Sequence, residues 1–160
     1  MLMIRLCLCA TLLIAAPLAA RESLGVYDGW AAFTDARPLR CYAIAKAQGS
    51  SPASAYATIS HWPDRKVRGA VHIVLSRDVA GTGGARLIVG GKRFDLVAKG
   101  RNAWAREASD DAAIIAALRS AARMSVSARG TKGGAFTDRY ALAGAATAID
   151  AATVGCAKWR

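Results

Sequence analysis

The chain has 160 residues, enough for one domain with a core that can fold alone. It carries 22 Lys and Arg against 11 Asp and Glu, a formal net charge of +11, so its expected partners are acidic. The alternative is that the charge only keeps an alanine-rich chain soluble. With 2 histidines in the whole chain, the composition argues against a histidine-rich zinc site.

Residues 1–20 have the layout of a secretory signal peptide. Arg5 precedes an apolar run over 6–16, and the small pair Ala19-Ala20 ends the segment. The apolar run is too short for a comfortable membrane span, although a retained N-terminal anchor is the alternative. We therefore predict a signal peptide over 1–20, a mature chain without a transmembrane segment, and a location in the periplasm or outside the cell.

Removal of the signal peptide changes the cysteine count. Cys7 and Cys9 leave with it, and Cys41 and Cys156 remain. An even pair of cysteines in an exported chain favours a disulfide, and this one would close nearly the whole mature domain. In the chain-entropy model, a closed loop on the order of 100 residues contributes ~4–5 kcal/mol. Two unpaired buried thiols are the alternative.

The first third of the mature chain has the composition of short strands separated by turns. Proline, glycine and serine clusters mark the turns, and the intervening stretches are rich in apolar and aromatic residues. In chain order, the sequence predicts strands at 23–35 and 40–47 with a turn at Arg37-Pro38, a loop at 48–55, a strand at 55–62 and a break at 62–66.

Stronger patterns follow. Residues 68–77 alternate, with Val71, Ile73 and Leu75 on one face. Residues 86–97 are two β-rich runs joined by a Gly-Gly pair, which predicts a hairpin. A further hairpin is predicted over 124–144, around a glycine-rich loop.

One amphipathic helix is predicted after Ser109, which can act as its N-cap. Asp110 and Asp111 follow where the helix dipole favours negative charge, so this carboxylate pair needs no catalytic explanation. Arg119 and Arg123 fall near the other end of the helix. The predicted apolar stripe consists of Ile114, Ile115, Leu118 and Ala122.

The last segment turns at Gly144 and continues with alanines, which predicts a thin helix or coil lying against a sheet. Together with roughly eight strands, these elements indicate a mainly β fold over 21–160. We expect an antiparallel β-sandwich or barrel-like domain with one amphipathic helix and a short C-terminal helical segment. The sequence shows no second domain, repeat or coiled coil.

Motifs for catalysis or phosphate binding are missing from the sequence. There is no G-x-S-x-G elbow and no S-x-x-K, and the glycine-rich stretches lack the G-x-x-x-x-G-K-[ST] and G-x-G-x-x-G patterns. His61 lies at a strand end and His72 inside a strand, without metal-site spacing. We predict no catalytic residue, metal site or cofactor.

Basic side chains near an aromatic residue are the candidate ligand-binding groups. Arginine can grip a carboxylate or sulfate through two parallel hydrogen bonds, so these groups would form a binding face if they gathered at one end of the fold. A scatter of the charges over all sides is the alternative. The candidates are Trp62, Arg65, Lys66, Arg68, Arg129 and Lys132.

The combination of an early DGW, then CYAIA, the stretch 110–134 and the stretch 137–156 resembles the invasion-associated locus B family. These are exported envelope proteins of Gram-negative, chiefly alphaproteobacterial, bacteria. The resemblance covers most of the mature chain, though little of it lies in 48–67. It implies a β-rich exported domain without a cofactor or a known active site. The second cysteine that family members commonly carry after the tryptophan is replaced here by the stretch 31–34.

We therefore expect a non-enzymatic exported envelope protein that binds an acidic envelope or host-surface component. The expected partners are acidic polysaccharide, anionic lipid headgroups or an envelope or host protein, with no nucleic acid. A cell-wall or envelope hydrolase is the alternative, and it requires His61 or His72 within hydrogen-bond reach of an Asp or Ser. A structural partner subunit is a third possibility, and it requires an exposed apolar patch.

Overall fold

The computed structural model describes residues 21–49, 55–81 and 83–159. The predicted signal peptide, most of the predicted loop at 48–55, and Arg160 lie outside the described residues.

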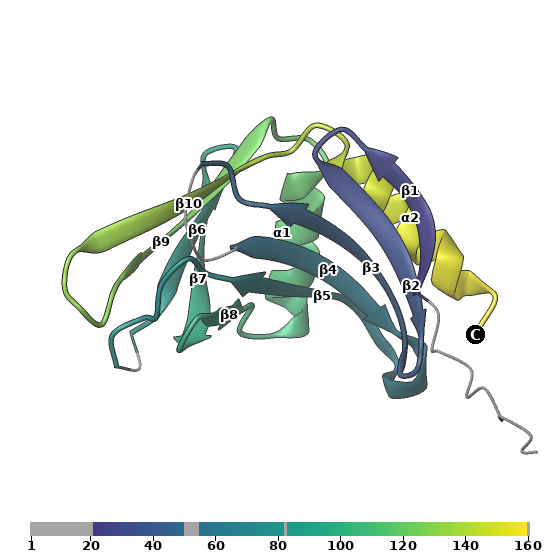
Figure 1. Cartoon of the computed structure of the whole chain (residues 1–160), viewed down its shortest axis with the longest axis horizontal. Helices are drawn as coiled ribbons and strands as arrows, with labels where there is room; N and C mark the ends of the chain where they lie inside the picture. Colours follow the sequence, from purple (N-terminus) through teal and green to yellow (C-terminus); the bar gives the residue numbers. More distant parts are fainter. Residues whose placement is uncertain (1–20, 50–54, 82, 160) are drawn as a thin grey trace, which may run out of the picture.

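Ten antiparallel strands form a single sheet in the order β1-β2-β3-β4-β5-β8-β7-β6-β9-β10 (Figure 1). The mainly β, antiparallel fold with two helices confirms the predicted fold class. The elements are β1 (Arg21–Tyr27), β2 (Trp30–Ala36), β3 (Leu39–Lys46), β4 (Tyr56–Trp62), the 3-10 turn η1 (Pro63–Arg65), β5 (Val67–Val74), β6 (Ala85–Val89), β7 (Lys92–Lys99), β8 (Asn102–Trp104), α1 (Ala108–Leu118), β9 (Arg123–Arg129), β10 (Ala135–Ala141) and α2 (Ala145–Ala157).

Side-chain alternation explains which side chains of β5 and the residue after it are buried. Val71, Ile73 and Leu75 point into the core with relative exposures of 4%, 0% and 0%, as their period-2 spacing predicts. The predicted hairpin at 86–97 is the β6–β7 pair, in which Val89 pairs with Lys92 across the Gly-Gly turn. Both glycines have positive φ, 53° and 91°, as a tight hairpin turn requires.

Three local predictions were wrong. The stretch 23–35 is not one strand: it is the β1–β2 hairpin, which turns at Asp28 with φ 50°, a conformation that Asp tolerates. Ser109 does not cap α1, which begins one residue earlier; its hydroxyl bonds the Glu107 carboxylate at 2.7 Å instead. Arg123 lies in β9 and not at the helix end.

Both helices pack on the same face of the sheet. α1 contacts β5, β6 and β7, and α2 contacts β1 to β4. Figure 1 shows both helices behind the strands. Arg119 at the end of α1 forms an ion pair with Asp150 of α2 at 2.6 Å. We call this covered side of the sheet the helix face and the other side the front face.

The two carboxylates of α1 have structural partners. Asp110 pairs with Arg106 at 3.0 Å, and Asp111 accepts a hydrogen bond from the Val71 backbone N–H at 2.8 Å. Burial raises the pKa of Asp111 above its ordinary value, more than that hydrogen bond lowers it. Asp111 thereby joins the first turn of α1 to β5.

A disulfide joins Cys41 of β3 to Cys156 of α2, as predicted. The two residues are 115 positions apart in the sequence. In the chain-entropy model a loop of that size contributes about 5 kcal/mol to stability. The disulfide therefore holds the C-terminal helix onto the helix face.

Contacts at the top of the sheet bring its last strand back toward its first strands. The indole N–H of Trp30 donates to the Ala141 carbonyl at 3.0 Å, and the Gln48 N–H donates to the Arg139 carbonyl at 2.7 Å. Gly144, with φ 83°, packs so closely on the Tyr27 carbonyl that a Cβ there would clash. These contacts curl the open sheet around the helices.

Candidate functional site

Strand register decides which side chains meet at the right-hand end of the sheet in Figure 1, where β4 ends and β5 begins. His61 pairs with Cys41, so the two share a face. Because Cys41 is bonded to α2, that face is the helix face. Trp62, the next residue, points to the front face. The end of β4 thus presents one ring to each side of the sheet.

A cavity of about 480 Å³ lies on the helix face, between the β4–β5 turn and the end of α2. We call it the basic pocket. The cationic side chains that line it, Lys66 and Arg68, are exposed, and none of the described residues that line it is acidic. Its full lining is His61, Pro63, Lys66, Val67, Arg68, Thr153, Cys156 and Trp159.

The pocket combines positive charge with exposed apolar side chains. Trp159 is 53% exposed and Val67 is 37% exposed, although the side chains of both are apolar. The Lys158 ammonium lies 5.4 Å from the centre of the Trp159 ring and adds a third cation near the rim. Such a site suits a ligand that carries a carboxylate, sulfate or phosphate beside a flat or apolar group.

Lys66 has an unusual backbone conformation. Its φ is 55° and its ψ is 26°, in the left-handed region, where it ends η1 and its N–H donates to the Pro63 carbonyl. A lysine in this region costs roughly 1–2 kcal/mol relative to the right-handed conformation. Backbone strain of this kind is concentrated at functional sites in proteins.

On the front face, Trp62 lies between two arginines. The Arg40 guanidinium carbon is 5.2 Å from the centre of its ring, and that of Arg65 is 4.8 Å away. Both distances are within the range of cation–π attraction. Arg65 therefore belongs to the front face, whereas Lys66 and Arg68 belong to the pocket.

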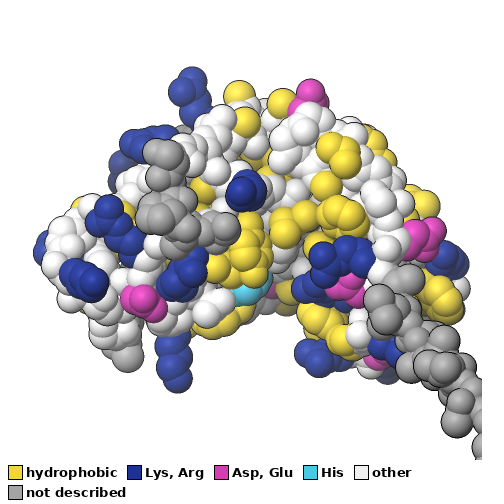
Figure 2. All heavy atoms as spheres, in the orientation of Figure 1, with side chains coloured by type: hydrophobic (Ala, Val, Ile, Leu, Met, Phe, Trp, Pro, Cys, Tyr) yellow, Lys and Arg dark blue, Asp and Glu magenta, His cyan; other side chains and the backbone are white. Residues whose placement is uncertain are grey.

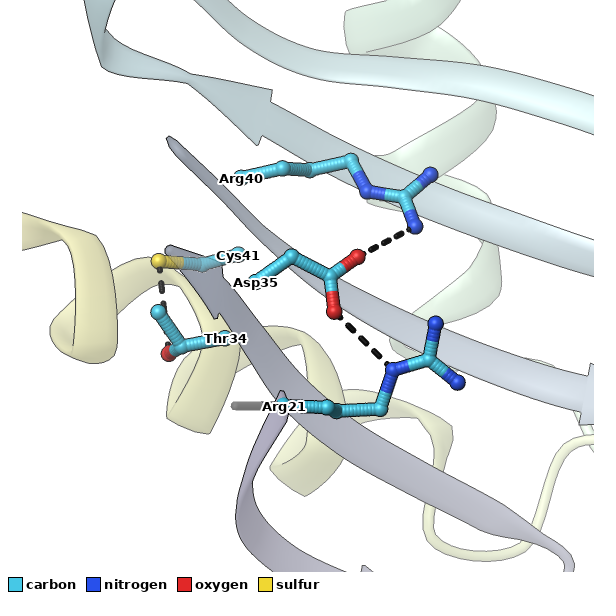
Figure 3. A network of polar contacts seen from close by, with 5 residues as sticks. All are labelled: Arg21, Thr34, Asp35, Arg40 and Cys41. Carbon is cyan, nitrogen blue, oxygen red and sulfur yellow. Dashed lines mark hydrogen bonds and ion pairs between the residues drawn. The ribbon is translucent and has the colours of Figure 1, made fainter. Parts of the chain in front are cut away.

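Two arginines of the front face share one carboxylate (Figure 3). Asp35 of β2 accepts hydrogen bonds from Arg21 Nε at 2.9 Å and from an Arg40 terminal nitrogen at 2.8 Å. Burial pushes the pKa of Asp35 up, but the hydrogen bonds and charges of the two arginines outweigh it and leave the pKa below its ordinary value. We call these three residues the arginine clamp.

The structure separates the predicted binding residues into two groups. Trp62, Arg65, Lys66 and Arg68 lie at the β4–β5 turn, and Arg129 and Lys132 lie at the β9–β10 turn. The β9–β10 loop contacts Asp78, which follows the far end of β5. β5 is 8 residues long, which corresponds to about 25 Å. The predicted binding residues therefore do not gather at one end of the fold.

The figures show the same separation. In Figure 1 the β9–β10 turn is at the left end of the molecule and the β4–β5 turn is at the right. Figure 2 shows basic side chains at both ends of this face with hydrophobic side chains between them. The reason is topological: the two turns are at opposite ends of antiparallel strands.

The second basic group has its own hollow of about 360 Å³. Lys132 lines it, and so do Arg77 and Asp78, so an acidic side chain lies among its cations. Several of its backbone N–H groups are already used within the loop: that of Thr131 donates to the Asp78 carbonyl at 3.0 Å, for example. This hollow is therefore less suited to an anion than the basic pocket.

The two histidines have neutral polar neighbours. His61 Nε2 lies 3.2 Å from Thr153 Oγ1, and His72 Nε2 lies 2.9 Å from Asn102 Oδ1. The His72 ring also stacks on Trp104. Among residues 21–49, 55–81 and 83–159, no three His, Cys, Asp or Glu side chains are grouped so as to hold a metal ion.

Sequence reasoning missed three contributors to this end of the molecule: Thr153, Trp159 and Arg40. A signal for the first two was present, because the predicted disulfide already placed the neighbours of Cys156 beside β3. Arg40 is one residue from Cys41, so alternation along β3 would have put it on the opposite face.

Comparisons with protein-family models, curated proteins and solved structures found no match for this chain. The resemblance to invasion-associated locus B proteins therefore stays a prediction. In the part of the chain that the structure describes, no helix has both the length and the hydrophobicity needed to cross a membrane.

Proposed function

We propose that this chain is a non-enzymatic exported envelope protein, similar to invasion-associated locus B proteins, that binds an acidic component of the envelope or of a host surface. The periplasm or the extracellular space is the proposed location. A bonded pair of cysteines suits an oxidising compartment.

One observation carries the proposal. The basic pocket has Lys66 and Arg68 on its wall and Trp159 beside them, and its lining within the described part of the chain contains no acidic residue. An anionic group in the pocket would meet uncompensated positive charge, and a ring attached to it would meet an exposed indole. The proposed binding surface is therefore one pocket, smaller than the broad basic face expected from the sequence.

The test compares two double variants that remove the same charges from opposite ends of the molecule. Lys66→Gln with Arg68→Gln empties the pocket of its cations, and Lys132→Gln with Arg129→Gln is the matched control. The probes are a heparin-derived disaccharide and, separately, vesicles containing phosphatidylglycerol. Affinity is measured by calorimetry for the sugar and by co-sedimentation for the vesicles.

We expect the pocket variant to lose at least about tenfold in affinity for an acidic probe, because charge-assisted hydrogen bonds contribute ~1.5–3 kcal/mol each. Wild-type affinity should also fall as salt is added. Equal losses in the two double variants, or a binding constant that salt does not change, would contradict the proposal.

A hydrolase is the alternative that one contact favours, since His61 and Thr153 meet at 3.2 Å inside the pocket. However, Thr153 Oγ1 also donates its proton to the Ile149 carbonyl at 2.8 Å. In that arrangement the Thr153 hydroxyl proton points to the Ile149 carbonyl and away from His61, whereas a general base must take it. Turnover of envelope polysaccharide by the wild type that Thr153→Val abolishes would favour the hydrolase.

A further inference from the structure

The arginine clamp is one part of a longer stack on the front face. Arg21 lies beside the Phe33 and Tyr42 rings, which contact each other, and the row continues from Tyr42 through Arg40 and Trp62 to Arg65. In order, the stack is Phe33, Arg21, Tyr42, Arg40, Trp62 and Arg65, and we call it the arginine ladder.

The distances along the ladder are within the range of cation–π contact, about 6 Å, and one of them is short enough for stacking. The Arg21 guanidinium carbon is 5.7 Å from the Phe33 ring centre and 5.8 Å from that of Tyr42. Arg40 lies only 3.9 Å from the Tyr42 ring, and Tyr42 is 2% exposed beneath these side chains. The ring contacts and the shared Asp35 carboxylate restrain the guanidinium groups of Arg21 and Arg40.

The clamp keeps hydrogen-bonding capacity and positive charge. A guanidinium has five N–H donors, and Arg21 and Arg40 each give one hydrogen bond to Asp35. Three ladder arginines face one carboxylate, so the ladder has an excess of two positive charges. The Arg21 side chain is 60% exposed and that of Arg40 is 25% exposed. An incoming anion would therefore find arginines that are already ordered, which lowers the entropic cost of binding.

The ladder and the basic pocket are on opposite faces of the same sheet end. Trp62 of the ladder and His61 of the pocket are consecutive residues of β4. The β4–β5 turn, with Arg65 on the front side and Lys66 on the pocket side, connects the two surfaces. Each surface combines cations with a tryptophan.

We propose that the arginine ladder is a second anion-binding subsite, and that the ligand of this end of the molecule is an acidic polysaccharide whose charged sugars occupy the pocket and the ladder together. This rests on the proposed function of the pocket. A polymer with repeated carboxylates or sulfates can reach both faces around the turn, and its sugar rings can lie against Trp62 and Trp159. A small anion such as a single headgroup can occupy one subsite only.

Sugar ligands of two lengths distinguish this inference from the proposal on which it rests. Heparin-derived disaccharide and octasaccharide are titrated into the wild type and into Arg40→Gln, Arg68→Gln and Arg93→Gln. Arg93 is an exposed arginine of β7 and serves as the matched control for loss of one charge. Thermal melting is recorded for each variant.

The wild type should bind the octasaccharide more tightly than the disaccharide. Arg40→Gln should weaken octasaccharide binding about tenfold and by a larger factor than it weakens disaccharide binding, while Arg68→Gln should weaken both and Arg93→Gln neither. If Arg40→Gln unfolds the protein, Arg21→Gln replaces it, because that arginine is the more exposed partner of the clamp.

Three results would overturn the inference. If Arg40→Gln and Arg93→Gln change the affinity for the octasaccharide equally, the ladder is not a subsite. The pocket proposal then stands provided that Arg68→Gln still weakens binding. If only phosphatidylglycerol vesicles bind, the ligand is a membrane surface and not a polysaccharide. If no acidic probe binds, the proposed function fails as well.

Discussion

Lys66 shows how one residue can connect backbone conformation and function. It lines the basic pocket with φ 55°, a value that asparagine tolerates better than lysine. Its ammonium group adds charge to the pocket, so the strained backbone has a functional explanation under our proposal. Stability and binding should then respond to this residue in opposite directions.

Lys66→Asn tests that trade-off. The variant should be more stable than the wild type by up to about 1 kcal/mol, because asparagine adopts the left-handed conformation at lower cost. Its affinity for the acidic disaccharide should fall, since one pocket cation is lost. Urea unfolding and calorimetry measure the two effects. A variant that is less stable and binds as well as the wild type would contradict this account of Lys66.

The sequence indicates which residues belong to the binding end of the molecule, but not on which face of the sheet each one lies. Trp62, Arg65, Lys66 and Arg68 were predicted together because they are neighbours along the chain, and the structure keeps them at one turn. Their division between two faces depends on the register of β4 with β3, where His61 pairs with Cys41. Register is set by contacts between distant residues, so composition alone could not give it.

At the scale of elements, α2 supplies one wall of the pocket. Thr153, Cys156 and Trp159 all come from this helix or the residues just after it. Its attachment to the sheet includes the disulfide from Cys156 to Cys41. The shape of the pocket should therefore depend on the oxidation state of this pair.

Replacing both cysteines by serine tests that dependence. The double variant Cys41→Ser, Cys156→Ser should lose about 2–5 kcal/mol of stability and bind the acidic disaccharide less tightly. A reductant should weaken wild-type binding in the same way and leave the double variant unchanged, which serves as the control. Unfolding curves and calorimetry with and without reductant make the comparison. Equal stability and affinity of the oxidised and reduced wild type would contradict this role of the disulfide.

Most elements could be predicted because their local patterns agree with their environments. Alternation identified β5, and the Gly-Gly pair identified the β6–β7 turn. β8 was missed because it has only 3 residues and forms its pairs with β5 and β7, which are distant in sequence. The β1–β2 hairpin was missed although a signal was present, because Asp28-Gly29 is a dipeptide typical of a two-residue hairpin turn.

At the scale of the whole molecule, topology decides where the charge lies. The basic group at the β4–β5 turn and the group at the β9–β10 turn are at opposite ends of the sheet because β5 runs the length between them. The order of the strands across the sheet is a long-range property, so a charge count gives the sign of the partner but not the location of its site. The three-dimensional fold is needed to tell whether basic side chains line one pocket or are spread over the surface.

The most direct test of the central claim is an NMR titration of the isotope-labelled protein with the heparin-derived disaccharide. The account predicts that the shifts are centred on the basic pocket, with the Trp159 indole and the amides of His61, Lys66 and Thr153 moving together. The amides of Thr131 and Lys132 should stay in place. Shifts centred on the β9–β10 loop, or spread evenly over the basic surface, would contradict the assignment of the pocket as the binding site.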